Sequence, residues 1–203
     1  MTKIKEISNI IILLLLPLIS MSQRFNFGAT AGMTFSQVNG DELAGYDKLG
    51  LEAGVRTDIF FTDRWNGVVE LLYSQRGSAS EITFSGDNAV YALKLNYLSI
   101  PVMVELKDWL IEDGGDSYYR IRFQGGLAYG QLFQSEETFG TGIQFPDNDL
   151  SFVGGIGIYA SRHWAFTLRY TRSIIPLDRV MVGPREVNVI PHHLTLSTQY
   201  MFF

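Results

Sequence analysis

The sequence of 203 residues contains no cysteine. The absence of thiols excludes disulfide bridges, thiol catalysis, haem attachment through a CxxC motif and zinc sites built from cysteine. Basic residues are also scarce, because 16 lysines and arginines stand against 21 aspartates and glutamates, which gives a net charge of −5. A weakly acidic chain without a basic run is a poor nucleic-acid binder, so we expect no nucleic-acid partner.

Charged residues of both signs make up only 18% of the chain, against about 25% in an average soluble domain. Glycine, with 20 residues, and aromatic side chains, at 13%, are abundant. This composition is typical of a β-rich chain or of a protein with an apolar outer surface, and composition alone does not choose between them. After the N-terminal segment, no apolar run is long enough to predict a membrane-spanning helix.

The first 22 residues have the pattern of a secretory signal peptide. Two lysines within the first five residues precede an apolar run of ten residues at 10–19. Ser22, with another serine two positions earlier, is the small residue expected before a cleavage site at Gln23. A transmembrane anchor would instead need about 20 apolar residues. We therefore expect a cleaved signal peptide at residues 1–22 and an exported domain at residues 23–203.

From Phe25 onward, apolar residues alternate with polar or small ones, and this period of two indicates β-strands. Eight such segments, of roughly 9 to 14 residues each, follow one another. Strands in soluble proteins usually have about five or six residues, whereas a strand that crosses a membrane needs about 9 to 11. The expected strands lie within residues 25–35, 49–61, 65–76, 93–106, 119–130, 150–159, 164–171 and 194–202.

One expected strand breaks the alternation. Leu95 and Tyr97 share one face, but the apolar residues from Leu98 onward occupy the other. Pro101 lies in the middle of this strand and cannot donate a ladder hydrogen bond. We therefore expect a β-bulge near residues 99–101 that returns both groups to a single apolar face.

The connections between the expected strands differ in length. Short turns at residues 62–64 and 161–163 contrast with long polar loops and one intermediate turn at 107–117. Short turns at one end and long loops at the other are typical of an outer-membrane barrel, with the short turns in the periplasm. We expect aromatic girdles at both ends and an acidic outer end that includes Asp147 and Asp149. The girdle candidates are Trp65, Trp109 and Trp164 at the short-turn end, and Tyr73, Tyr97, Tyr129 and Tyr170 at the long-loop end.

The charged residues of the strands lie on the face opposite to the apolar residues. In lipid the sheet must close, which directs the apolar face outward and the charged face into the lumen. A soluble, lipocalin-like barrel would reverse these faces, but the strand lengths and the loop asymmetry favour the membrane. We predict a self-neutralising lumen network of five arginines and three acids. Its members are Glu52, Arg56, Asp58, Glu70, Arg76, Arg120, Arg122 and Arg169.

Several motifs resemble the PorT-like family of small outer-membrane β-barrel proteins of Bacteroidetes. They are ELLYSQRG at residues 70–77, LNYLSIPV at 95–102 and the glycine-rich VGGIG at 153–157. The resemblance covers the whole chain after the signal peptide and implies an integral outer-membrane barrel. The founding member implies a role in type IX protein secretion. The sequence departs from the family at Ser99, where many members carry an acidic residue.

Catalytic and metal-binding signatures are absent from the sequence. It contains no GxSxG, HExxH or P-loop motif. His192 and His193 are adjacent, so on a strand they point to opposite faces and cannot chelate one metal together. His193 and Ser197 lie about 13 Å apart along one strand, too far for a base and a nucleophile. We expect no enzymatic activity, no cofactor and no metal.

The expected product is an all-β, eight-stranded antiparallel up-and-down transmembrane barrel in the cell outer membrane. An eight-stranded barrel has an interior just wide enough for its side chains, so we expect a filled lumen. Its expected role is that of a structural or interaction component of the envelope, with the type IX accessory role implied by the resemblance. A narrow solute pore and an outer-membrane enzyme remain as alternatives. The expected partners are outer-membrane lipid, lipopolysaccharide, and envelope or secretion proteins reached through the long loops.

Overall fold

The computed structural model describes residues 25–39, 48–79, 92–113, 116–137, 147–174, 178–182 and 185–202. The expected signal peptide and its cleavage site between Ser22 and Gln23 lie outside these residues. No helix within the described part of the chain is long and apolar enough to cross a membrane. The strands are β1 (Phe25–Asn39), β2 (Lys48–Phe60), β3 (Trp65–Ala79), β4 (Ala92–Asp113), β5 (Asp116–Glu137), β6 (Asn148–Tyr159), β7 (Trp164–Ser173), β8 (Asp178–Val182) and β9 (Arg185–Met201).

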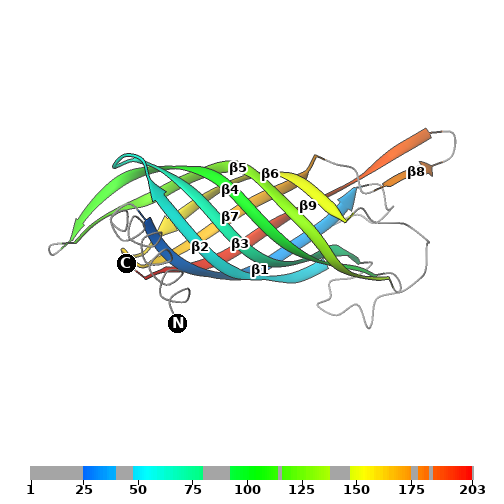
Figure 1. The fold of residues 1–203 in the computed structure, drawn as a ribbon, viewed down its shortest axis with the longest axis horizontal. Helices are drawn as coiled ribbons and strands as arrows, with labels where there is room; N and C mark the ends of the chain where they lie inside the picture. The colour runs from blue at the N-terminus through cyan, green and yellow to red at the C-terminus, as the bar shows by residue number, and fades with distance from the viewer. Residues whose placement is uncertain are drawn as a thin grey trace, which may run out of the picture.

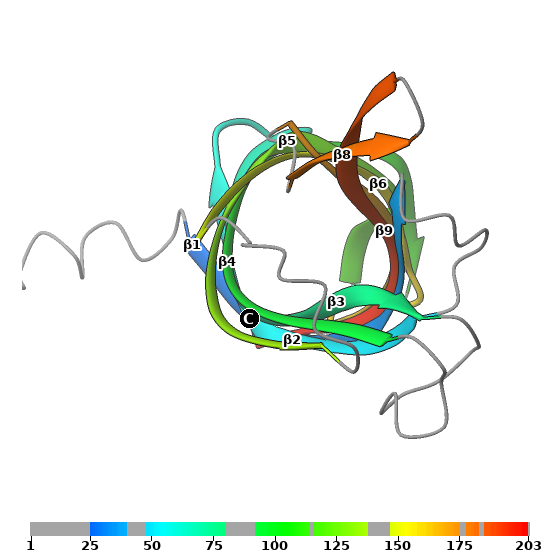
Figure 2. The same ribbon diagram turned by 90° about the vertical axis from the view of Figure 1, so that its right-hand side faces the viewer.

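Eight of these strands form a closed antiparallel ring (Figure 1), which Figure 2 shows end-on. Each strand of the ring pairs with its neighbour in the order β1 to β7 and then β9, and β9 pairs with β1 to close the ring. The short strand β8 pairs only with residues 185–189, at the start of β9. The expected eight-stranded barrel is therefore confirmed, and the last expected loop holds an additional β-hairpin.

The apolar face of the sheet points outward, as the alternation in the sequence predicts. β7 alternates between exposed and buried residues along its whole length. Its outward residues include Phe166 and Leu168, while Thr167 and Arg169 are buried in the lumen. Exposed aromatic side chains stand at both ends of the barrel in the expected positions. They are Trp65, Trp109 and Trp164 at the short-turn end, and Tyr73, Tyr129 and Tyr170 at the long-loop end.

The expected bulge at residues 99–101 is wrong. From Tyr97 to Glu105, β4 alternates strictly between buried and exposed residues, so Tyr97 points into the lumen and Leu98 points outward. Leu95 and Asn96 are both buried, and Leu95 lines a small lumen cavity with Tyr97 and Arg76. The β3–β4 ladder lacks the pairs at residues 100 and 101, and its register is the same before and after this gap. Pro101 therefore fits into the strand without a bulge. The irregularity lies in the neighbouring ladder, where the register shift between Asn96 and Tyr97 leaves an extra residue in β5. Tyr97 is consequently not a girdle residue.

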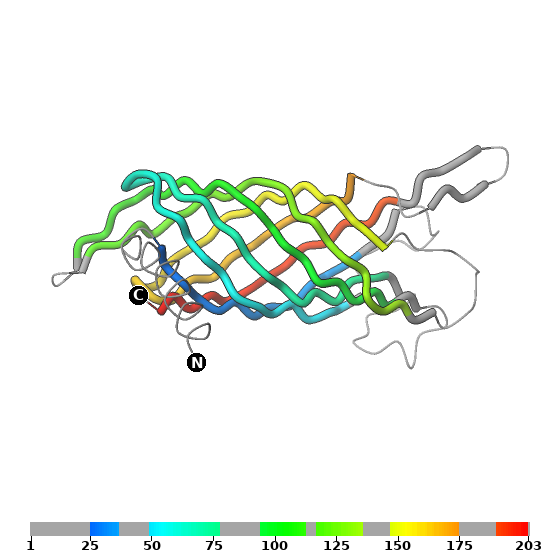
Figure 3. Tube along the Cα trace, viewed as in Figure 1, coloured from blue at the N-terminus to red at the C-terminus, as the bar shows by residue number. Residues whose placement is uncertain are grey.

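β4 and β5 are much longer than a membrane crossing requires. Each has 22 residues, and they pair as far as Asp113 and Asp116. The intermediate turn expected at 107–117 is therefore a two-stranded ribbon. It extends past the other strands at the short-turn end of the barrel (Figure 1, Figure 3).

Candidate functional site

Arg56, on β2, lies at the centre of the charged lumen. Its Nε is 2.6 Å from Oδ1 of Asp58, and its Nη2 is 2.6 Å from Oε2 of Glu105 on β4. Its Nη1 is 3.5 Å from Oε1 of Glu70, the residue directly opposite on β3. Arg56 is only 1% exposed, so all of these ion pairs are shielded from bulk water.

A second group of contacts crosses the lumen from β7 to β3. Arg169 binds Glu70 with both ends of its guanidinium, through Nη1–Oε2 at 2.8 Å and Nη2–Oε1 at 3.0 Å. The Nη1 of Arg169 also lies 3.9 Å from Oε1 of Glu52. β3 and β7 are not neighbours in the sheet. These bonds therefore tie opposite walls of the barrel together, and the bidentate geometry makes them strong.

Arg122, on β5, extends the network toward the short-turn end. Its Nη1 is 3.2 Å from Oε1 of Glu105 and 3.5 Å from Oδ2 of Asp58. The guanidinium lies 3.4 Å from the centroid of the Tyr159 ring, and the buried tyrosine gives it a cation–π contact.

Arg76, on β3, forms a separate cluster toward the long-loop end. Its guanidinium bonds Oδ2 of Asp149 at 3.0 Å and Oγ of Ser99 at 2.7 Å, and lies 4.8 Å from the Tyr97 ring centroid. Asp149 also accepts hydrogen bonds from Ser151 and Ser173. The cluster therefore closes the lumen with charge-assisted bonds from four strands, β3, β4, β6 and β7.

The structure brings seven of the eight predicted lumen residues together, and the eighth is excluded. Arg120 is exposed on the ribbon, where its guanidinium lies 5.4 Å from the Trp109 ring centroid. Its place in the alternation is that of a lumen residue, but β5 pairs with β6 only from Ile121 onward. Arg120 thus lies beyond the closed ring, and the prediction that it belongs to the network is wrong. The seven that meet in the lumen are Glu52, Arg56, Asp58, Glu70, Arg76, Arg122 and Arg169.

Two acidic members of the network were missed from the sequence. Glu105 is buried and contacts both Arg56 and Arg122, and the alternation along β4 from Tyr97 onward predicts its position. Asp149, expected at the acidic outer end, is buried against Arg76 instead. With these two, the described part of the lumen holds five carboxylates and four arginines. The ammonium of Lys107 lies at the short-turn mouth, beside Phe60 and Tyr119, and brings the formal charge to zero.

The two adjacent histidines of β9 were expected on opposite faces of the strand. His193 is buried on the lumen side, and the ring of His192 lies 6.2 Å from the outward Tyr170, but His192 is buried as well and both histidines line one small cavity beside Arg76. No group of three or more histidines, aspartates or glutamates that could hold a metal ion occurs within the described ranges. The lumen contains ion pairs between different strands of the barrel wall, and in each pair the opposite charges neutralise one another.

The chain is similar to one protein family and to several solved structures. A family model described as an outer membrane protein beta-barrel domain matches residues 20–179. The crystal structure of Ail, the attachment invasion locus protein of Yersinia pestis, is similar with a TM-score of 0.50 and 14% identity, over 87% of this chain and 98% of that chain. Neisserial surface protein A (NspA) is 12% identical with a TM-score of 0.47, over 88% of this chain and 97% of that chain. At such identities the likeness to Ail shows the fold alone, and no curated protein matches the chain.

Proposed function

Because this chain belongs to the outer membrane protein β-barrel domain family and is a protein of the outer membrane, we propose that it acts there as a structural or interaction component of the envelope, without enzymatic activity. The observation that carries the proposal is the filled lumen. Ion pairs cross it between β3 and β7, and Arg56 joins carboxylates from three strands at its centre. The interior of an eight-stranded barrel is just wide enough for its side chains to fill, so we expect these ion pairs to leave no open channel.

The proposal predicts negligible conductance in planar lipid bilayers. A double variant, Glu70→Ala with Arg169→Ala, removes the bidentate pair that crosses the lumen and is expected to raise the conductance above that of the wild type. The matched control is Leu168→Ala, which shortens a neighbouring side chain on the lipid face. A steady open channel of porin size in the wild-type protein would contradict the proposal and favour the narrow-pore alternative.

The finer proposal is that the barrel is an accessory of type IX secretion in the PorT-like manner. Its support is the resemblance in residues 70–77 and 95–102 together with the contacts of those motifs. Arg76 from the first motif bonds Ser99 from the second, so the position at which the sequence departs from the family still provides an acceptor for the arginine. The two motifs are therefore joined in the lumen.

Deletion of the gene tests this finer proposal. Cargo of the type IX system is expected to accumulate in the periplasm, and a wild-type copy is expected to restore secretion. An Arg76→Leu copy, folded by the criterion of heat-modifiable gel mobility, is expected to restore less. Normal secretion in the deletion strain would overturn the accessory role and leave the structural role standing. The long-loop end is proposed to face lipopolysaccharide, with exposed Asp147 at its rim.

A further inference from the structure

The short-turn mouth of the barrel holds a buried ammonium group, that of Lys107 on β4. Lys107 is only 7% exposed, and its Nζ lies 4.8 Å from the ring centroid of Phe60 and 5.6 Å from that of Tyr119. Among the described residues, these two rings are its side-chain partners, and none provides a carboxylate or another hydrogen-bond acceptor. A buried charge is costly unless it is paired and hydrogen-bonded. An anion from outside the chain would therefore find three unused donors on this ammonium.

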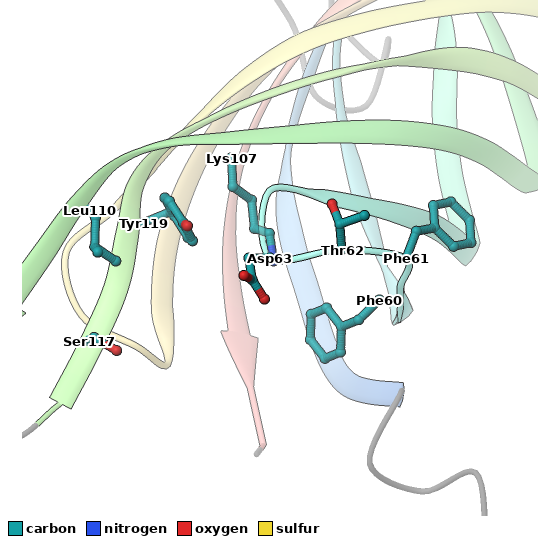
Figure 4. A pocket seen from close by; sticks show the side chains of 8 residues that line it. All are labelled: Phe60, Phe61, Thr62, Asp63, Lys107, Leu110, Ser117 and Tyr119. Atoms are coloured by element: carbon teal, nitrogen blue, oxygen red, sulfur yellow. The ribbon is translucent and has the colours of Figure 1, made fainter.

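An open pocket of about 610 Å³ lies beside this ammonium, between the β2–β3 turn and the ribbon of β4 and β5 (Figure 4). Of the described residues that line it, only Asp63 and Lys107 are charged. A ligand in the pocket therefore meets one carboxylate and one ammonium, which together are complementary to a ligand that carries both an anionic and an ammonium group.

The other charges of the turn and the ribbon do not change this balance at the pocket. Those with described side chains are exposed outside the lining, two positive and two negative: Arg64, Arg120, Asp108 and Glu112. Asp113 and Asp116 pair with each other at the far end of the ribbon. The pairing of opposite charges inside the pocket therefore decides which ligand fits.

An apolar groove adjoins the pocket on the lipid-facing side of the barrel. It has a volume of about 430 Å³ and crosses from Ile59 of β2 over β3 and β4 to Leu127 of β5. Every described residue that lines it is apolar or glycine. Phe61 lines both the groove and the pocket, so the two hollows meet at this ring.

The groove is preformed by glycines and by a fixed turn. The Phe61 ring lies over Gly67, where a Cβ would come within 2.8 Å of Cζ of the ring. At Gly125 the nearest atom to such a Cβ is 3.9 Å away, so the surface is hollow there. The turn that carries Phe61 is held because the amides of Phe61 and Thr62 both donate to the carbonyl oxygen of Trp65 at 3.0 Å.

The pocket is level with the lipid headgroups of the periplasmic leaflet. Trp65 and Trp109 are exposed at the short-turn end, where aromatic girdles mark the membrane interface. Trp65 directly follows the turn that lines the pocket, and Trp109 lies two residues after Lys107. The groove belongs to the lipid-facing surface, so bilayer lipid is its neighbour on the open side.

We propose that the pocket and the groove together bind one phospholipid of the periplasmic leaflet, whose headgroup carries a phosphate and a primary ammonium, as in phosphatidylethanolamine. The phosphate pairs with the ammonium of Lys107, and the headgroup ammonium faces the carboxylate of Asp63. One acyl chain passes Phe61 and lies in the groove. This lipid site goes beyond the proposed structural or interaction role and does not depend on it.

Native mass spectrometry of the purified barrel in detergent tests the site with defined lipids. The probes are the dioleoyl forms of phosphatidylethanolamine, phosphatidylcholine and phosphatidylglycerol, which share their chains and differ in the headgroup. We expect one ethanolamine lipid per barrel, bound at least fivefold more tightly than the other two. The quaternary ammonium of choline cannot donate to Asp63, and the glycerol headgroup has no ammonium. Equal binding of the three lipids would overturn the site, whether or not any variant folds.

Two pairs of variants separate the headgroup from the chain. Lys107→Met is expected to weaken the ethanolamine lipid at least fivefold, whereas Lys107→Arg keeps the charge and most of the affinity. Gly125→Val fills the groove and is expected to weaken all three lipids alike. Its matched control is Gly154→Val, because Gly154 pairs with Gly125 and also faces open space but lies outside the groove lining.

Heat-modifiable gel mobility shows which of these variants are folded. Unchanged lipid binding in folded Lys107→Met, or equal effects of the two valine variants, would overturn the proposal. Glycerophosphoethanolamine, which is the headgroup without its chains, distinguishes a lipid from a soluble ligand. We expect no adduct at the concentration that saturates the lipid, and an adduct of equal affinity would assign the pocket to a soluble ligand and overturn the lipid site.

Discussion

Replacement of Glu70 by leucine perturbs the carboxylate that joins the two central arginines. Glu70 accepts two bonds from Arg169 and lies 3.5 Å from Arg56. After its removal Arg56 keeps Asp58 and Glu105, but among the described carboxylates Arg169 keeps only Glu52, at 3.9 Å. Removal of one partner of a buried ion pair costs about 3 to 5 kcal/mol. We expect Glu70→Leu to lower the free energy of unfolding by that amount.

The double variant separates a lost contact from an orphaned charge. When Arg169→Met accompanies Glu70→Leu, both members of the bidentate pair are replaced by apolar side chains, and the unbranched methionine retains part of the length of the arginine. Such complete replacement of a buried pair is often neutral, although Glu52 then loses its contact with Arg169. We therefore expect the double variant to recover about 2 kcal/mol of the loss caused by Glu70→Leu alone.

The assay is urea-induced unfolding in liposomes, with the folded fraction read from heat-modifiable gel mobility. Thr167→Val is the matched control, because it alters an uncharged lumen residue near Arg169, and it is expected to cost about 1 kcal/mol or less. The reasoning is refuted if Glu70→Leu is as stable as the control, or if the losses of the two single variants simply add in the double variant.

Three other substitutions test the outward face, the strand spacing and the ribbon. Leu168→Arg places a charge on the half-exposed lipid face and is expected to cost about 2 to 4 kcal/mol in liposome unfolding, whereas Leu168→Val is nearly silent. Gly54→Ala is expected to destabilise by about 1 to 3 kcal/mol, since a Cβ there would lie 2.0 Å from the Leu71 carbonyl oxygen, whereas Gly154→Ala enters open space and leaves the urea midpoint unchanged. Tyr118→Phe removes the bond to Ala160 and is expected to speed amide hydrogen exchange in residues 107–120, with the exchange of β7 as the internal control.

The alternation of side chains made the barrel predictable. The period of two is a property of the strand itself, so it survives wherever a strand has lipid on one side and lumen on the other. Glu52, Arg56, Glu70 and Arg169 were placed correctly on the lumen face for this reason alone. Their pairing was not predictable, because the register of non-neighbouring strands decides which charges meet.

The errors arose where a strand departs from the rule that its apolar residues face lipid and its polar residues face the lumen. Leu95 and Tyr97 are apolar or aromatic residues inside the lumen, where Tyr97 covers Arg76, and treating them as lipid-facing required a bulge that does not exist. That bulge in turn left Glu105 unassigned. Arg120 follows the alternation but lies beyond the ring, because parity fixes the face of a residue and says nothing of its height along the barrel.

The bonds that cross the lumen join residues far apart in the chain. Glu70 and Arg169 are 99 residues apart, and the Arg56 guanidinium reaches Gln199, 143 residues away, at 3.4 Å. Contacts of such sequence separation form late in folding, since the entropy of closing the intervening chain must be paid first. A sheet that holds β2 and β3 but not yet β7 and β9 exposes unpaired carboxylates and guanidinium groups toward a lumen that is still open. The final strands therefore stabilise charges that β2 and β3 brought into the membrane, and closure of the ring becomes cooperative.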